Sequence, residues 1–437
     1  MSYFHLNLIL KGKLTVCCLL MLPAIPLNAQ REAKQIGDFK ESISLNEHLR
    51  GTKRTLQYRP DGDEFVCVNG KNRYTRALYG SHSPFRVETS DRPVFAFYNN
   101  GRGGNISFKV ILRDGTELAL DCTGHCESRY SAGKRTYYLT DPSWGKGELR
   151  ISVLALADMD GAIWRFSPSN MPKGAILRWQ HGGATGKRLS RNGDMGVDPA
   201  DCFELPVEAT DLVTGELPLQ KEVYLVRGEV PEDYNVRKLY QQAEAASLAL
   251  ASHLKIETPD PYLNTLGGAL VAAADGIWDG QVWLHGAIGW RMPLSGWRAG
   301  YTGDALGWHD RARTHFDAYA ASQVTDVPNT IPHPVQDSTM NLARSEKRWG
   351  TPQYSNGYIC RNPRRNNQMH HYDMNLCYMD ELLWHFNWTG DTAYVRKMWP
   401  VITRHLAWEK LNYDPDNDGL YDAYACIWAS DALYSVS

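Results

Sequence analysis

Aromatic, basic and acidic side chains alternate with glycine in one stretch of the chain, between positions 283 and 310. A sugar-binding site needs apolar ring faces together with a few well-placed polar groups that pair with hydroxyls. The stretch therefore predicts a sugar-binding site, and a packed loop held by Arg–Asp ion pairs is the alternative. The candidate binding residues are Trp283, His285, Trp290, Arg291, Trp297, Arg298, Tyr301, Trp308, His309 and Asp310.

Two aspartates, Asp304 and Asp431, are the candidate catalytic residues. Hydrolysis of a glycosidic bond uses one carboxyl group as the acid and a second that activates water or attacks the sugar. Asp431 follows Trp428, a further candidate for substrate binding, and partial burial there would raise its pKa as a general acid requires. We predict Asp431 as the acid and Asp304 in the sugar-binding site, with the base beyond this sequence.

Each aspartate also has a structural alternative. Asp304 could be the N-cap of a helix that includes His309 and His315, and Asp431 could lie at the cap or in the first turn of another helix. Local pattern alone leaves both alternatives open.

An acidic loop between two helical segments carries Asp414, Asp416 and Asp418 at alternate positions, followed by Gly419. This spacing matches the first half of an EF-hand calcium loop, but the twelfth position is Ala425, so the bidentate glutamate is missing. A full EF-hand is therefore not expected. Calcium at the three aspartates stays open beside a rigid acidic loop, and no other metal or cofactor is predicted.

Length, charge and the N-terminal segment limit the class of protein. The 437 residues suggest two or three domains. A net charge of −2 gives no sign of nucleic-acid binding. Residues 1–29 resemble a cleaved signal peptide, with Lys11 and Lys13 before an apolar run and Ala29 at the cleavage site. That run is too short to span a bilayer, so we expect a periplasmic or secreted protein without a membrane span after cleavage.

Seven cysteines remain after residue 29, which leaves at least one without a partner inside the chain. Cys122 and Cys126 could close a small loop, but their spacing alone is poor support for a zinc site. We expect buried or loosely paired cysteines.

The first large region, residues 30–230, is predicted to be a β-sandwich. Short alternating runs are separated by turn signals such as Asp61-Gly62 and Asp114-Gly115, without helices between them. The segment from Asn99 to Asn105 is predicted to be a loop or hairpin. The predicted strands are Glu64–Val68, Pro93–Tyr98, Asn105–Leu112, Glu117–Asp121, Arg135–Thr140, Glu148–Ala155, Ala162–Phe166 and Ala175–Gln180.

Helical periodicity follows. A helical linker is expected over 231–258, closed by Pro259 and Pro261, and 259–437 is expected to be part of an (α/α)6 barrel with long loops at 280–306 and 324–368. Pro400 should kink or break one helix. Because only four or five barrel helices are present, we expect a truncated barrel. The predicted apolar faces are Tyr262, Leu266, Ala269, Ala273 and Ile277; Tyr372, Leu376, Met379, Leu383 and Phe386; and Val395, Trp399, Ile402 and Leu406.

These motifs resemble those of the six-hairpin glycosidase superfamily. The segment Gly296-Trp-Arg-Ala-Gly-Tyr-Thr-Gly-Asp304 is similar to the Gly-Trp-x-Gly-Asp segment of α-L-rhamnosidase-type barrels, and Asp414–Asp422 followed by Trp428 is similar to a loop of glucosylceramidase-type barrels. The overall resemblance is to multidomain Bacteroidetes-type enzymes of glycoside hydrolase family 142, which are β-L-arabinofuranosidases. The sequence departs from these patterns at Cys426, where an acidic residue is expected, and after Arg291, where a carboxylate is missing.

The resemblance implies an inverting glycoside hydrolase that acts on side chains of complex polysaccharides. Two other classes stay open. A non-catalytic glycan-binding protein or inactive fragment would need the aromatic loop but no paired carboxylates. A polysaccharide lyase would instead use a Tyr or His base and a cation for the uronate, roles that His285, Tyr301 and Arg298 could fill.

Overall fold

The computed structural model describes residues 57–71, 76–99, 102–182, 212–230, 233–286, 291–296, 298–325, 330–331, 353–354, 356–364, 372–414 and 416–421. All of them belong to one compact unit, Gln57–Ser437. The predicted signal peptide lies outside the described residues.

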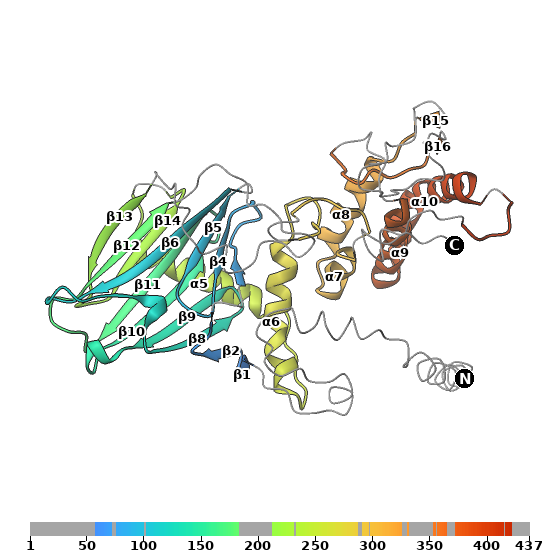
Figure 1. Cartoon of the computed structure of the whole chain (residues 1–437). Coiled ribbons are helices and arrows are strands. Elements are labelled where there is room, and N and C mark those ends of the chain that lie inside the picture. Colours follow the sequence, from blue (N-terminus) through green and yellow to red (C-terminus); the bar gives the residue numbers. More distant parts are fainter. Residues whose placement is uncertain are drawn as a thin grey trace, which may run out of the picture. The chain divides into compact units, whose positions relative to one another are not determined.

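Two antiparallel sheets form the first half of this unit (Figure 1). In the first sheet the strand order is β1-β2-β8-β9-β10-β11-β14, and in the second it is β13-β12-β6-β5-β4-β3 with β7 beside β6. The first sheet contains β1 (Arg59–Asp61), β2 (Glu64–Val68), β8 (His125–Ser131), β9 (Lys134–Thr140), β10 (Glu148–Ala155), β11 (Gly161–Ser169) and β14 (Val223–Gly228). The second contains β3 (Arg76–Leu78), β4 (Arg86–Thr89), β5 (Phe95–Asn99), β6 (Arg102–Ile111), β7 (Glu117–Ala119), β12 (Ile176–Gly182) and β13 (Val213–Pro218).

The two sheets pack face to face around one apolar core. Trp164 on β11 is fully buried, and its ring lies 5.5 Å from that of Phe95 and 6.1 Å from that of Phe108, both on the opposite sheet. Alternation along each strand sends such side chains inward, as expected for packed sheets with one buried face each. The predicted pair of packed β layers is confirmed.

Predicted strands agree best with observed ones where apolar and polar residues alternate. The bounds of β2 and β10 match the prediction, and Asn99 pairs with Arg102 across the predicted hairpin. In contrast, the sequence did not predict β4 or β8. Their buried side chains include Arg86 on β4 and Ser128 on β8, so the alternation of hydrophobicity is missing there.

Cys122 and Cys126 do not close the small loop that their spacing would allow, because both are free thiols. Cys126 is buried within β8, and its thiol donates to the backbone oxygen of Asp91, whereas Cys122 is exposed.

The second half of the unit is helical, and it contains α5 (Val236–Ala251), α6 (Pro261–Gly276), α7 (Gly300–Ala305), α8 (His309–Ala321), α9 (Tyr372–Thr389) and α10 (Thr392–Tyr413). Two short strands, β15 (Thr330–Ile331) and β16 (Gln353–Tyr354), pair with each other. None of the described helices is both long and apolar enough to cross a membrane.

Helix ends follow local capping chemistry. The predicted linker helix is α5, which begins after Asn235, whose side chain accepts from the backbone N–H of Lys238 at 3.0 Å. Pro261 does not close that helix as predicted. It is the first residue of α6, after the N-cap Asp260, where a missing N–H and a fixed φ are favourable.

The predicted apolar faces are partly wrong. On α6 the buried face consists of small residues such as Thr265, Gly267 and Ala272, whereas Ala273 is exposed. On α10 the buried face includes His405 and Glu409, so Trp399 and Leu406 lie in solvent. The helix also runs through Pro400 without the predicted break.

Candidate functional site

Three titratable side chains meet where α7, α8 and α9 come together. The carboxyl group of Asp304, near the end of α7, lies 2.7 Å from Nδ1 of His309 and 2.9 Å from Nδ1 of His385. Asp304 is not the N-cap of α8, a position that Trp308 occupies. The backbone places Asp304 and His309 together because Gly307, with a φ of +73°, turns the chain sharply between the two helices.

The two histidines differ in their exposure to solvent. The side chain of His385 is fully buried, whereas that of His309 is 43% exposed and that of Asp304 only 2%. A carboxylate has only acceptor atoms, so each imidazole donates an N–H from Nδ1 to it. In the neutral form of His309, Nε2 then carries the lone pair and can accept a proton. Asp304 therefore holds the Nδ1 side of the His309 ring and is itself screened from solvent.

A buried carboxyl group lies one helical turn before His385 on α9. Glu381 is 1% exposed, and burial raises its pKa to about 8. Its side chain lies against the start of α7, near the N–H groups of Arg298 and Gly300, which lower its pKa by a smaller amount. Neither carboxyl oxygen has a well-formed hydrogen bond to any residue that the structure describes. A Cβ atom at position 300 would lie 2.4 Å from Oε2, so any larger residue there would have to displace the carboxyl group of Glu381.

Trp283 is fully buried, which is at odds with a role as a sugar platform. Its ring packs against Trp278, and its backbone N–H donates to Nδ1 of His315 at 3.1 Å. Burial lowers the pKa of His315 to about 3, so this imidazole is neutral at ordinary pH. The pair belongs to the core of the helical half.

Two Arg–Asp ion pairs lie beside the predicted sugar-binding stretch, and neither has both partners within it. Arg311 contacts Asp275 at 2.7 Å, and Arg364 contacts Asp279 at 2.6 Å. Arg291 donates to the backbone oxygens of His82 and Gly276 and is therefore tied to the backbone.

The remaining candidates are more accessible. Tyr301 on α7 donates its hydroxyl to Asp380 on α9, and burial together with this carboxylate raises the pKa of Tyr301. Arg298 is exposed and has a φ of +58°. Asp310 is exposed in the first turn of α8.

Two further aromatic candidates are half-buried. Trp308 packs beneath the guanidinium group of Arg311, 4.5 Å from the ring centre. His285 donates its backbone N–H to the oxygen of Met292. Four predicted residues lie outside the described part of the chain: Trp290, Trp297, Trp428 and Asp431.

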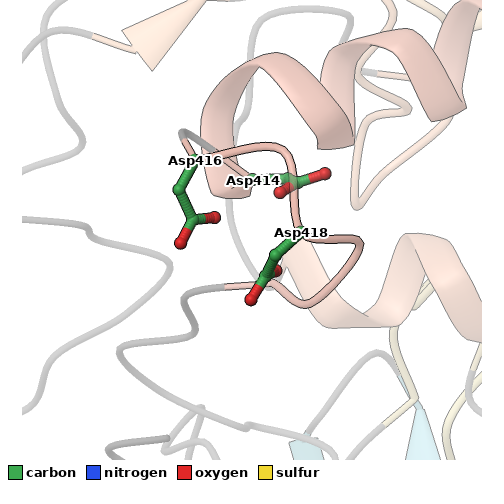
Figure 2. Close-up of side chains that lie close together, drawn as sticks. All are labelled: Asp414, Asp416 and Asp418. Atoms are coloured by element: carbon green, nitrogen blue, oxygen red, sulfur yellow. The ribbon is translucent and has the colours of Figure 1, made fainter.

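The acidic loop follows α10 directly. Figure 2 shows Asp414 at the end of the helix and Asp416 and Asp418 on the loop beyond it, and one carboxyl oxygen of each lies within 4.8 Å of the others. Asp414 is buried, and the other two are exposed. Gly419 has a φ of +85°, which gives the sharp turn that the sixth position of a calcium loop requires. These residues could hold a hard divalent cation, and the calcium prediction stays a prediction.

Sequence reasoning did not assign His385, Glu381 or His315 to the site. One signal could have found the first two. Glu381 and His385 are four residues apart, so they share one face of a helix whose other residues are largely apolar. The link between His385 and Asp304 is not visible in the sequence, because 81 positions separate them.

Comparison with known proteins bears on the sheets and not on this site. The sequence model of a domain of unknown function, DUF4450, matches residues 100–229. This range contains the strands from β6 to β14 and ends before α5. No curated protein matches the chain. The match therefore covers a part of the β region that ends before the helices carrying Asp304, His309 and Glu381.

Proposed function

We propose that this chain is part of an exported glycoside hydrolase that acts on side chains of complex polysaccharides, and that its helices α6 to α10 belong to an (α/α)6 barrel. The observation that carries the proposal is the pair formed by buried Asp304 and half-exposed His309, 2.7 Å apart. The motif resemblance, including that to β-L-arabinofuranosidases, supports the substrate class.

In this proposal His309 contacts the substrate or its attacking water, and Asp304 is a positioning residue. A base that is itself oriented by a buried carboxylate is a recurrent way to hold an imidazole in one tautomer. Asp304 is too buried to act on a sugar directly, so its proposed role changes from that of a sugar-binding group to the orientation of His309. Asp431, outside the described residues, stays the proposed acid.

Release of reducing sugar from soluble arabinan, arabinogalactan and arabinoxylan tests the proposal. The full chain and its His309→Gln variant are compared, with His125→Gln as the matched control, because His125 is an exposed histidine on β8. We expect the His309 variant to lose about 100-fold or more of the rate, which is typical of a lost acid or base. Equal rates in all three proteins would show that His309 takes no part in the reaction. Glycan binding without sugar release would indicate a non-catalytic binding protein.

The same geometry favours a second candidate, a polysaccharide lyase. Such enzymes remove a proton from carbon, and an imidazole with its Nδ1 held by a carboxylate suits that step. Arg298, exposed at the start of α7, could then neutralise a uronate. Incubation with pectin or alginate distinguishes the two reactions, because a lyase forms an unsaturated product that absorbs in the ultraviolet and a hydrolase does not.

A further inference from the structure

One fully buried imidazole in the helical half has no part in the reaction proposed above. The side chain of His385, on α9, is completely shielded from solvent. The centre of its ring lies 5.4 Å from that of Phe316 on α8 and 5.4 Å from that of Tyr394 on α10. Because a close-packed core leaves little room for rotation, these two neighbours hold the ring in one orientation.

The polar contact of this ring is made with Asp304. Nδ1 of His385 lies 2.9 Å from Oδ1 and 2.9 Å from Oδ2 of that carboxylate. An N–H at equal distances from both oxygens points between them, so it fixes the direction of the carboxylate. Oδ1 is also the atom that lies 2.7 Å from Nδ1 of His309. The direction from which Asp304 meets His309 therefore depends on His385.

The other nitrogen of the His385 ring shows what the ring is for. Nε2 has no hydrogen-bond partner among the described residues. A buried polar atom without a partner costs stability, so an apolar side chain would fill this place at least as well if packing alone mattered. Asp304, which is 2% exposed, needs a donor to stay charged. His309 cannot meet that need alone, because it is 43% exposed and water competes for its N–H.

We propose that His385 is a positioning residue, which holds the carboxylate of Asp304 so that Oδ1 keeps His309 in one orientation and one tautomer. Its part in turnover rests on the function proposed above for His309. Reacting groups must be held to a fraction of an ångström, and side chains whose own rotamers are locked by packing hold them best. His385 is locked in this way, whereas half-exposed His309 is not. His385 itself does not contact the substrate.

Substitutions at position 385 separate the hydrogen bond from the packing. His385→Leu fills the space without a donor, whereas His385→Asn keeps an amide N–H close to the position of Nδ1. His385→Gln moves the amide toward the position of Nε2, and it replaces the leucine variant if that variant does not fold. The matched control is His405→Leu, because His405 is a second fully buried histidine, on α10. Melting curves of the full chain establish that each variant is folded.

Spectra of the chain labelled with 15N-histidine show which nitrogen of neutral His309 carries the proton. We expect the proton on Nδ1 in the native chain, in His385→Asn and in the His405 control, and a mixture of the Nδ1 and Nε2 forms in His385→Leu. On a polysaccharide that the native chain cleaves, His385→Leu should lower kcat by about 10- to 100-fold and change KM by less than about threefold. His385→Asn should recover most of the lost rate.

A double variant tests whether His385 acts through His309. In the His309→Gln background, His385→Leu should cause no further loss of rate, because residues that act as one unit are not additive. A further loss would overturn the proposal. So would an unchanged Nδ1 tautomer in folded His385→Leu, or a loss of rate in His385→Asn or His405→Leu equal to that in His385→Leu. A native chain that releases no sugar would refute the proposed function, and the His309 tautomer would still decide the role of His385.

Discussion

Buried charges have different partners in the two halves of the molecule. In the sheets, Arg86 donates to the backbone oxygens of Ser83 and Gly276, and Arg135 donates to the backbone oxygen of Ser90. In the helices, two pairs of buried titratable side chains contact each other: Asp304 with His385, and His405 with Glu409.

The difference matters because backbone oxygens have a fixed charge, whereas a histidine–carboxylate contact can gain or lose a proton. An arginine that contacts backbone oxygens fixes the chain and nothing more. A cluster of titratable side chains responds to pH and can exchange protons with a ligand. The titratable contacts of the helices are thus of the kind that proton chemistry uses, whereas the arginine contacts of the sheets serve stability.

The largest effect is expected in the sheet core. Trp164→Ala should lower the free energy of unfolding by about 3–5 kcal/mol, because it leaves a cavity between the two sheets. Chemical denaturation at pH 5 and pH 8 should show the same loss at both values, since no titratable group is removed. A loss that depends strongly on pH would show that titratable groups also stabilise the sheet core.

The next effect concerns Glu381, whose pKa is raised to about 8 by burial. Its protonated form is favoured in the folded chain, so its contribution to stability is full below about pH 4.5 and is lost as the pH rises through about 8. Glu381→Gln keeps the side chain neutral. We expect thermal unfolding of this variant to match the native chain at pH 4 and to show greater stability at pH 9, by several kcal/mol. A constant difference at both pH values would contradict a buried neutral carboxyl group.

The contribution of His315 to stability should depend on pH in the opposite direction. Burial lowers its pKa to about 3, so the neutral imidazole contributes stability that is present above about pH 6.5 and is lost as the pH falls toward 3. The native chain should lose about 2 kcal/mol from this group by pH 5. His315→Gln, whose amide oxygen can still accept from Trp283, should flatten that part of the pH profile. If this variant loses as much stability at low pH as the native chain, other groups cause that loss.

The smallest effect is expected at the acidic loop. Calcium at ten times its dissociation constant should stabilise the chain by about 1.4 kcal/mol if Asp414, Asp416 and Asp418 bind it. Melting curves with calcium and with a chelator measure this, and the Asp416→Asn, Asp418→Asn double variant serves as the control. An equal shift of the melting temperature in the control would show that calcium binds elsewhere in the chain.

The sequence predicted the architecture of the sheets better than the helical half. Strand β10 could be found because apolar residues alternate along it, whereas β4 carries buried Arg86 and Glu88 and shows no such pattern. On α10 the periodicity favoured Trp399 and Leu406, but the buried side contains His405 and Glu409, whose Nε2 and Oε1 atoms lie 3.2 Å apart. A rule that counts only apolar residues cannot find a face of this kind.

The candidate site could be predicted only in part. Asp304 and His309 stood out because they share a short segment rich in glycine and aromatic residues. His385 and Glu381 could not be joined to them, because α9 reaches α7 only through tertiary packing. The burial of Trp283 was also invisible, since an aromatic residue in a loop can face either the core or the solvent.

The position of the proton on neutral His309 shows whether Asp304 orients this imidazole. In the chain labelled with 15N-histidine, the spectrum of the His309→Gln variant identifies the signals of this residue. We predict that neutral His309 carries its proton on Nδ1, because that atom donates to Asp304, and that Asp304→Asn shifts the proton to Nε2. A native His309 with its proton on Nε2 would contradict the account, since Asp304 would then not orient this imidazole.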